Sequence, residues 1–241
     1  MFHSMYIGDK NTWDDYSLVP QSKIYIPVAS QKTKVVQIEG ANGSLDLSTL
    51  LTGYPVYGQR TGTASFYLLD AIDVKALTNS GYAYPANYTF YDIFDKLRGD
   101  LDGKIADMWL EDDPDWTYHG RFNVKSAMAD PRPSVEISYA LDPYKVAKTP
   151  VAYDMNGLGT IINRTVIPAE IGTMPASFHF TLTGGQGTIT FQNPTVGIDQ
   201  TRTFGVGEYT VYEWVVYGDT TILLSAGTGV HMHIEYFPGR L

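Results

Sequence analysis

The stretch NGSLDLSTLLTGYPVYGQR, residues 42–60, decides how the rest of the chain is interpreted. It opens on Asn-Gly, a strong turn signal, and runs into a short apolar patch. It ends on an aromatic run shaped by Gly and Pro, which suits neither the interior of a helix nor a catalytic loop. The segment therefore needs an explanation based on contacts rather than on catalysis.

The composition limits the possible classes of protein. With 241 residues and 44% hydrophobic content, the chain can form one large β domain or two ordinary domains. Aromatic residues make up 13% of it and charged residues 18%, a combination that favours β-sheets and protein–protein contacts. The net charge of −9 argues against a general nucleic-acid-binding protein, whose affinity comes from Lys and Arg at the phosphates.

The absence of cysteine excludes disulfides, thiolate zinc sites and Cys nucleophiles, and it fits folding in a reducing cytoplasm. We expect no export signal, because MFHSMYIGDKNTW lacks a basic region followed by an apolar one. We also expect no membrane span, because no apolar stretch is long enough.

A change in charge density divides the sequence. Residues 1–149 hold 14 Lys and Arg and 19 Asp and Glu, whereas residues 150–241 hold only 3 and 7. This change predicts two domains, residues 1–148 and 149–241, with the boundary inside DPYKVAKTPV, where two prolines bracket a short basic linker.

The hydrophobic patterns predict a mainly β protein. Strands are expected at residues 23–28, 33–40 and 134–141, and one amphipathic helix from Asn87 to Leu101. Asn87 or Thr89 is the expected N-cap, and Gly103 lies just past the end. The apolar face of this helix consists of Phe90, Ile93, Phe94, Leu97 and Leu101. Residues 150–241 contain short alternating runs, which predict a β-sandwich or jelly roll.

Three motifs resemble functional sites, but each has a more ordinary interpretation. The carboxylates of LEDDPDWTYHG could bind Ca²⁺ or form a glycosidase pair, yet Asp-Asp-Pro-Asp is a strong turn signal. His231 and His233 share one face of a strand, but no third metal ligand has a supporting spacing. Gly-Gly-Gln-Gly at residues 184–187 lacks the Lys of a phosphate-binding loop and is interpreted as a hairpin turn.

No nucleophile motif is present, and the five histidines have no recognisable Ser and Asp partners. We therefore expect no enzyme, no metal and no cofactor. Six aromatic residues could form a platform that stacks on sugar: Trp109, Trp116, Tyr118, Tyr212, Trp214 and Tyr217. Packing in the core explains most buried aromatic residues in small β-sandwiches.

Five blocks together resemble one protein family. They are WDDYSLVP, VVQIEGANGSLDLSTLLTGYPVYGQR, LRGDLDGK, WLEDDPDWTYHGRF and YALDPYK, in that order over about residues 1–148. In this order they are similar to the N-terminal domain of the distal tail protein of long-tailed, non-contractile bacteriophages. Residues 149–241 fit the galectin-like β-sandwich that often follows that domain, by architecture only.

The resemblance implies a structural virion protein located at the tail tip and assembled in the cytoplasm of the host bacterium. N-terminal β-sandwich-like domains with one helix would form a homohexameric ring around a channel that DNA crosses without specific binding. The implied partners are the tail-tube protein, the tail-associated hub or tip protein and a receptor-binding protein. Aspartates such as Asp100, Asp102 and Asp107 would make the channel negative.

Aromatic and Arg side chains are the usual anchors of subunit interfaces. The sequence therefore predicts that Tyr54, Tyr57, Arg60 and Phe66 lie in or beside the contact between subunits. The alternative is that they only stabilise a local turn.

Two other functions stay open. The second domain could be a carbohydrate-binding module for cell-wall polysaccharide, although no sugar-binding group of His, Asn, Arg and Glu is visible in its sequence. A cell-wall glycosidase would use Glu111 and Asp115.

Overall fold

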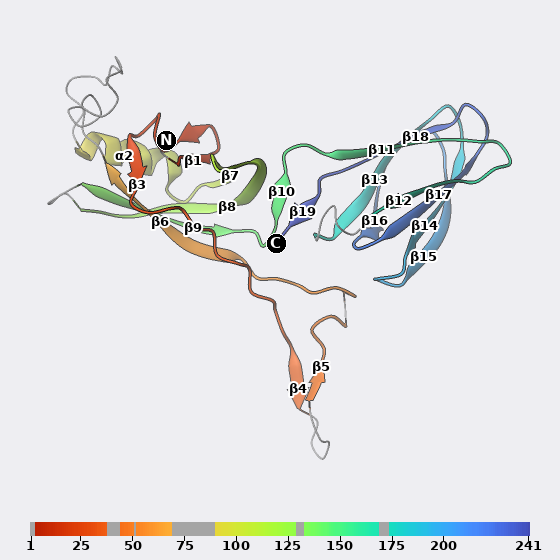
Figure 1. The fold of residues 1–241 in the computed structure, drawn as a ribbon, viewed down its shortest axis with the longest axis horizontal. Helices are drawn as coiled ribbons and strands as arrows, with labels where there is room; N and C mark the ends of the chain where they lie inside the picture. The colour runs from red at the N-terminus through yellow and green to blue at the C-terminus, as the bar shows by residue number, and fades with distance from the viewer. Residues whose placement is uncertain (1–2, 38–43, 51, 69–89, 129–132, 169–173) are drawn as a thin grey trace. The chain divides into compact units, whose positions relative to one another are not determined.

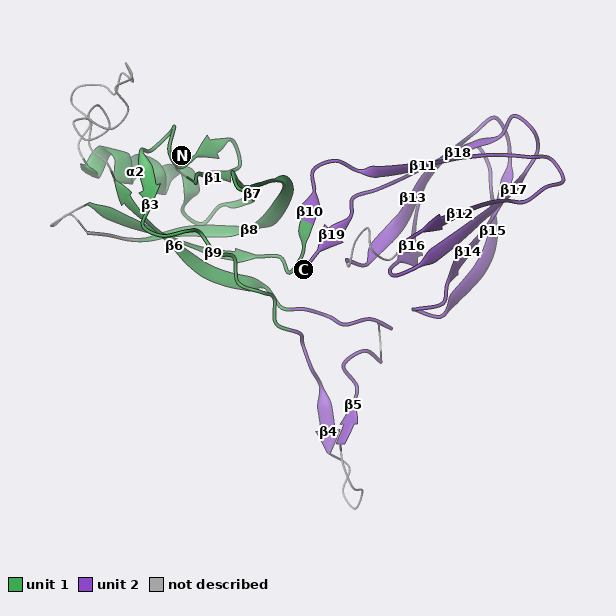
Figure 2. Ribbon diagram, viewed as in Figure 1, with its two compact units in different colours: residues 1–30, 58–145 green, residues 31–57, 146–241 purple. Residues whose placement is uncertain are grey.

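The structure is a computed structural model that describes residues 3–37, 44–50, 52–68, 90–128, 133–168 and 174–241. Its internal contacts divide the chain into two units, coloured separately in Figure 2. Unit 1 comprises residues 1–30 and 58–145, and unit 2 comprises residues 31–57 and 146–241. The break after Lys145 falls inside the predicted linker, and the segment 31–57 groups with the second unit.

Unit 1 is built on an antiparallel sheet. Its strands follow the order β2-β1-β7-β8-β9-β6-β3 (Figure 1). Their bounds are β1 (Met5–Ile7), β2 (Lys10–Asn11), β3 (Leu18–Pro20), β6 (Arg60–Leu68), β7 (Ile105–Leu110), β8 (Asp113–Met128) and β9 (Ser134–Leu141). The predicted strand at 134–141 coincides with β9, whose buried and less buried residues alternate as its sequence does.

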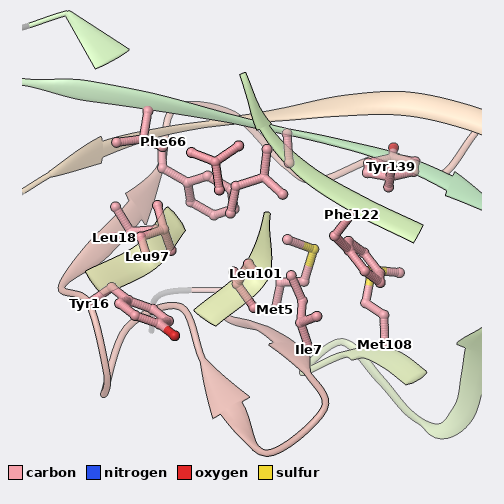
Figure 3. Packing of buried hydrophobic residues seen from close by; sticks show 14 of the residues in the cluster. Met5, Ile7, Tyr16, Leu18, Phe66, Leu97, Leu101, Met108, Phe122 and Tyr139 are labelled. Carbon is pink, nitrogen blue, oxygen red and sulfur yellow. The ribbon is translucent and has the colours of Figure 1, made fainter. Parts of the chain in front are cut away.

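One helix within the described residues, α2 (Phe90–Leu101), packs against β8. Ile93, Leu97 and Leu101 are buried in the same core as the strands, and Phe90 and Phe94 pack against it, as the periodicity predicts. The N-cap candidates Asn87 and Thr89 lie outside the described residues. Figure 3 shows the helix residues Leu97 and Leu101 beside Leu18 and Met5 in this core.

Two predicted strands differ from the structure. Residues 23–28 run without strand pairing, although Ile24 and Ile26 still pack against the core of unit 1. Residues 33–40 contribute only β4 (Val35–Gln37), and residues 38–40 lie outside the described ranges. β4 pairs with β5 (Ser44–Asp46) as a two-stranded ribbon within the described part of the chain.

Unit 2 contains the predicted β-sandwich. One sheet has the order β11-β18-β13-β16 and the other β12-β17-β14-β15. Their bounds are β11 (Val151–Asn156), β12 (Asn163–Ile167), β13 (Ala176–Thr183), β14 (Gly187–Asn193), β15 (Ile198–Phe204), β16 (Gly207–Val216), β17 (Thr220–Ala226) and β18 (His231–Tyr236). Two short strands, β10 (Lys145–Ala147) and β19 (Gly239–Arg240), pair near the ends of this unit.

Aromatic side chains from both sheets fill the sandwich core. The ring of Phe191 stacks on that of Trp214 with centroids 5.3 Å apart, and Phe178 lies 5.3 Å from Phe191. All three side chains are buried. Offset contacts between rings add to the free energy gained from their buried area, so this cluster ties the two sheets together.

The segment Gly184 to Gly187 is not the predicted hairpin turn. It joins β13 to β14, which belong to different sheets, so the chain crosses from one layer of the sandwich to the other here. Close packing explains the first glycine, because a Cβ at Gly184 would lie 1.9 Å from the carbonyl oxygen of Gly229.

Candidate subunit-contact surface

Arg60 holds three segments of unit 1 together. Its Nε donates to the carbonyl oxygen of Pro143 at 2.7 Å, and its NH1 group donates to that of Pro27 at 3.1 Å. The guanidinium lies 5.6 Å from the ring centroid of Tyr118, and the side chain is only 5% exposed. Three of the quoted sequence blocks, which contain Arg60, Tyr118 and Pro143, therefore meet at one buried cation.

The Tyr-x-Gly-Arg motif at residues 118–121 has a structural explanation. Gly120 lies opposite Leu141, and a Cβ at this glycine would be 2.3 Å from the carbonyl oxygen of Ala140. Only glycine therefore allows β8 and β9 to approach this closely. Arg121 donates from NH1 to the carbonyl oxygen of Gly103, just past the end of α2, at 2.6 Å. The motif thus fixes the helix end to the sheet.

Phe66 lies in the core of unit 1, with no exposed surface (Figure 3). Nearby, a cavity of about 280 Å³ lies between residues 22–27 and β6. Tyr139 borders this cavity, and its hydroxyl donates to the carbonyl oxygen of Tyr25 at 2.9 Å. The lining contains Lys23 but no carboxylate or imidazole, so the cavity offers no pair of groups for acid–base chemistry.

The segment 31–57 of unit 2, which we call the arm, exposes apolar side chains. Val35 is 56% exposed, Leu45 49% and Leu50 71%. Every described residue of β4 and β5 is exposed. A two-stranded hairpin is at best marginally stable in water by itself, so these side chains favour contact with another surface.

The Leu-Asp-x-Ser part of the opening stretch forms a local turn in the arm. The Asp46 carboxylate accepts hydrogen bonds from the backbone N–H and the hydroxyl of Ser48. These bonds lower the pKa of Asp46 below its usual value. Ser48 in turn accepts a hydrogen bond from the backbone N–H of Lys34 at 2.8 Å, which links the turn back to the start of β4.

Tyr54 and Tyr57 lie at the C-terminal end of the arm and are partly buried. The ring of Tyr54 lies 5.3 Å from that of Tyr217 in the sandwich. Tyr57 forms an isolated bridge with Gln31, which closes the base of the arm. Of the four predicted interface residues, Arg60 and Phe66 are thus buried inside unit 1, while Tyr54 and Tyr57 belong to the arm.

The turn in the acidic segment is confined to Glu111 and Asp112, between β7 and β8, whereas the predicted turn residues 113–115 already belong to β8. Its carboxylates take separate partners. Glu111 accepts a hydrogen bond from the backbone just ahead of β1, the Asp112 carboxylate lies 2.6 Å from His3, and Asp113 pairs with Lys145 at 2.5 Å.

The three aspartates considered for a channel lining each have a partner in unit 1. Asp100 accepts the hydroxyl of Tyr16 at 2.8 Å, and Asp102 accepts the backbone N–H of Val124 at 3.0 Å. The Asp107 carboxylate lies 2.7 Å from a ring nitrogen of His119. Burial, together with the bond to Asp100, raises the pKa of Tyr16 well above its usual value.

The aromatic residues considered for sugar stacking are divided between the two units. Trp109, Trp116 and Tyr118 belong to unit 1, and the other three belong to unit 2. Trp109 stacks on Tyr6 with centroids 3.6 Å apart, and Trp214 is buried in the sandwich core. Tyr212 is the most exposed of the six at 76%.

His231 and His233 share one face of β18 as predicted, but a third side chain does lie beside them. Asp154 of β11 contacts both imidazoles. Within the described ranges, no group of three or more His, Asp and Glu side chains is arranged to hold a metal ion. No helix in those ranges is long and apolar enough to span a membrane.

No protein-family model matches the sequence, and no curated protein matches it either. A comparison of structures finds a similar fold in the crystal structure of the SPP1 Dit (gp 19.1) protein. That protein is described as a paradigm of the hub adsorption apparatus in phages that infect Gram-positive bacteria. The TM-score is 0.63 at 14% sequence identity, and the match covers 98% of this chain and 99% of the other. Over almost its whole length, this chain therefore has the fold of a phage Dit protein.

Proposed function

We propose that the chain is a structural virion protein of a long-tailed phage. It would form a hexameric ring that joins the tail tube to the tail tip or baseplate and anchors receptor-binding proteins. The observation that carries this proposal is the likeness to a phage hub protein over almost the full length of both chains. Fold alone does not determine function, so the features of this chain must also fit the role.

The arm fits a ring-forming protein. Its exposed Val35, Leu45 and Leu50 are apolar groups that a second copy of the chain can bury. A contact between different surfaces of identical subunits closes into a ring when the rotation between neighbours is a simple fraction of a turn. We therefore infer that Tyr54 and Tyr57, at the end of the arm, lie in or beside this contact. Arg60 and Phe66 would support it from inside unit 1.

The remaining partners follow from the same role. One face of the ring would contact the tail-tube protein and the other the tail-associated hub or tip protein. The net charge of −9 suits a channel that DNA crosses without binding, because like charges repel. Of the pair considered for a glycosidase, Glu111 and Asp115, the Glu111 carboxylate already accepts a hydrogen bond from the backbone N–H of Ser4, which favours this structural role.

The mass of the purified protein tests the ring. Six chains of 26.7 kDa give a particle of about 160 kDa by light scattering or native mass spectrometry. Val35→Glu should raise the concentration needed for assembly about tenfold or more, because it would bury a charge at the contact. A strict monomer at every concentration would contradict a ring that forms from this chain alone.

Two variants make the test specific. Val206→Glu introduces the same change at a residue that is 64% exposed in the sandwich, and it should leave assembly unchanged. Tyr54→Ala combined with Tyr57→Ala should weaken the ring without unfolding unit 1. If the double variant forms a ring as resistant to dissociation as the parent, these two residues are not at the interface. Arg60 is unsuitable for this test because its loss would disturb the core.

A further inference from the structure

Among the described residues, the sandwich of unit 2 has four edge strands, β11 and β16 on one sheet and β12 and β15 on the other. The open side of an edge strand presents backbone N–H and C=O groups with which a further strand can pair. Charged side chains and irregular pairing protect many edges from such pairing. The side chains of each edge strand therefore decide whether it can accept another strand.

Three of the edge strands are protected. β11 carries Asp154, and β15 carries Asp199 and Arg202 among exposed polar residues. β16 carries Glu208 and Glu213, and its pairing with β13 shifts register part of the way along. These features make a further strand unfavourable at three of the four edges.

β12 differs from the other edge strands in its exposed side chains. Alternation puts Arg164 and Val166 on one face of the strand, where both are exposed. Ile162, two residues before Arg164, continues this spacing and is 57% exposed, and Val166 is 41% exposed. Ile161, in the turn that precedes the strand, is 63% exposed. The edge at β12 therefore presents apolar side chains on both sides of one Arg.

The backbone of β12 selects an extended partner. Within the described ranges β12 pairs with β17 alone, so its other side is open. In an antiparallel strand, alternate residues direct their N–H and C=O groups to the same side, which gives the open side a row of donors and acceptors. An extended segment of another chain satisfies such a row with main-chain hydrogen bonds. A helix, whose backbone bonds are internal, does not.

Arg164 selects the charge of that segment. On the opposite edge of the same sheet, the guanidinium of Arg202 lies 3.6 Å from Glu213. Arg164 forms no such ion pair in the part of the chain that the structure describes. A carboxylate directly across from it on an added strand would supply this partner, because side chains on neighbouring strands interact when they share a face.

The same Arg disfavours a second copy of β12 as the added strand. Antiparallel pairing of two copies about Thr165 would place both Arg164 side chains diagonally on one face, with their backbones about 7–8 Å apart. Pairing about Arg164 would place them directly opposite each other. Like charges at these positions repel. An acidic segment of a different protein therefore fits this edge better than β12 itself.

We propose that β12 binds an extended segment of a second protein, which adds to the four-stranded sheet as a fifth strand. Apolar side chains of the segment would contact Ile162 and Val166, and an Asp or Glu between them would pair with Arg164. All of these groups belong to unit 2, so the site goes beyond the proposed ring and does not rest on it.

Hydrogen–deuterium exchange of the full-length protein with a synthetic peptide tests the proposal. The peptide acetyl-Thr-Val-Thr-Glu-Thr-Val-Thr-amide places Val, Glu and Val on one face, to match Ile162, Arg164 and Val166. At about 1 mM peptide, exchange in residues 161–167 should slow about twofold or more, because pairing covers the open N–H groups of β12. A peptide with Lys in place of Glu should bind more weakly.

A change of charge makes the test specific. Arg164→Glu should weaken binding of the Glu peptide about fivefold and should favour the Lys peptide instead. Arg202→Glu makes the same change on β15, at the opposite edge of the sheet, and should keep the preference of the parent for the Glu peptide. Because both Arg side chains are exposed, circular dichroism should show that the two variants stay folded.

Three results would overturn the proposal. The first is unchanged exchange in residues 161–167 with either peptide, and the second is a preference for the Glu peptide that survives Arg164→Glu. The third is exchange in β12 that slows with protein concentration alone, which would mean that a second copy covers this edge. The proposed ring is tested by the mass of the particle, so failure of the peptide to bind would leave it untouched.

Discussion

At the scale of single residues, several residues in and near the quoted sequence blocks of unit 1 allow the chain to pack closely. Gly62 is an example: a Cβ built on it would lie 2.4 Å from the hydroxyl oxygen of Tyr139 and 2.6 Å from its Cζ. The ring has little freedom to move, because its hydroxyl also donates to the carbonyl oxygen of Tyr25. Arg60 and Gly120 act in a similar way, because each allows segments that are distant in the sequence to lie close together.

We predict that Gly62→Ala lowers the free energy of unfolding by about 1–3 kcal/mol, because the new methyl group overfills a packed contact. Gly99→Ala is the matched control. Gly99 lies on the exposed side of α2 with nothing within 4 Å of an added Cβ, so alanine there should stabilise the protein by about 0.5–1 kcal/mol. Urea denaturation measures both. Equal effects of the two substitutions would contradict the clash with Tyr139.

Residues that act through distant partners could not be identified from the sequence. His231 and His233 were visible as a pair, but Asp154, which contacts both, lies 79 residues before His233. Only the pairing of β11 with β18 brings these residues together. The burial of Arg60 cannot be predicted from the sequence either. An Arg close to Tyr and Gly suggests an exposed residue at an interface, and only the structure shows that its partners are buried carbonyl oxygens.

At the scale of elements, regular patterns predicted the structure well and local contacts caused the differences. The apolar spacing of α2 and the alternation in β9 match the observed elements. Residues 23–28 have an equally good strand pattern but no ladder. The backbone N–H of Gln21 donates the last backbone hydrogen bond to β6. After Gln21, the cavity and the ring of Tyr139 lie between residues 22–27 and β6. The alternation of Ile24 and Ile26 arises because both side chains pack against the core, and a segment can pack in this way without hydrogen bonding to a neighbouring strand.

One turn of the sandwich depends on a single buried amide. Asn193, at the end of β14, has no exposed surface. Its Nδ2 donates to the carbonyl oxygens of Val215 and Tyr217, and its Oδ1 accepts from the backbone of Thr195 and Val196. Every polar atom of this side chain is therefore satisfied, and both kinds of contact hold the chain that leaves β14.

We predict that Asn193→Asp lowers the free energy of unfolding by on the order of 3 kcal/mol, because a carboxylate oxygen would replace the donor that faces two carbonyl oxygens. Gln192→Glu makes the same change of charge on the adjacent, outward-facing residue, where it replaces an exposed contact with the Asp199 carboxylate, and should cost no more than about 1 kcal/mol. Thermal unfolding followed by circular dichroism compares the two. A small effect at Asn193 would mean that water or a shift of the turn replaces the lost donor.

At the scale of the whole molecule, the residues that the structure describes form two hydrophobic cores with no residue in common. The first contains Leu97 of α2, and the second contains Leu182 of β13. Each core is large enough to support its own cooperative unfolding. Because the two cores share no residue, a change in one core need not disturb the other.

We therefore predict two transitions in calorimetry, each sensitive to one core. Leu97→Ala and Leu182→Ala both remove a fully buried side chain, and each should destabilise its own unit by about 2–5 kcal/mol. Leu97→Ala should lower the midpoint of one transition and Leu182→Ala that of the other, because changes at sites with no shared partners act independently. If either variant moves both transitions equally, the two units unfold as one.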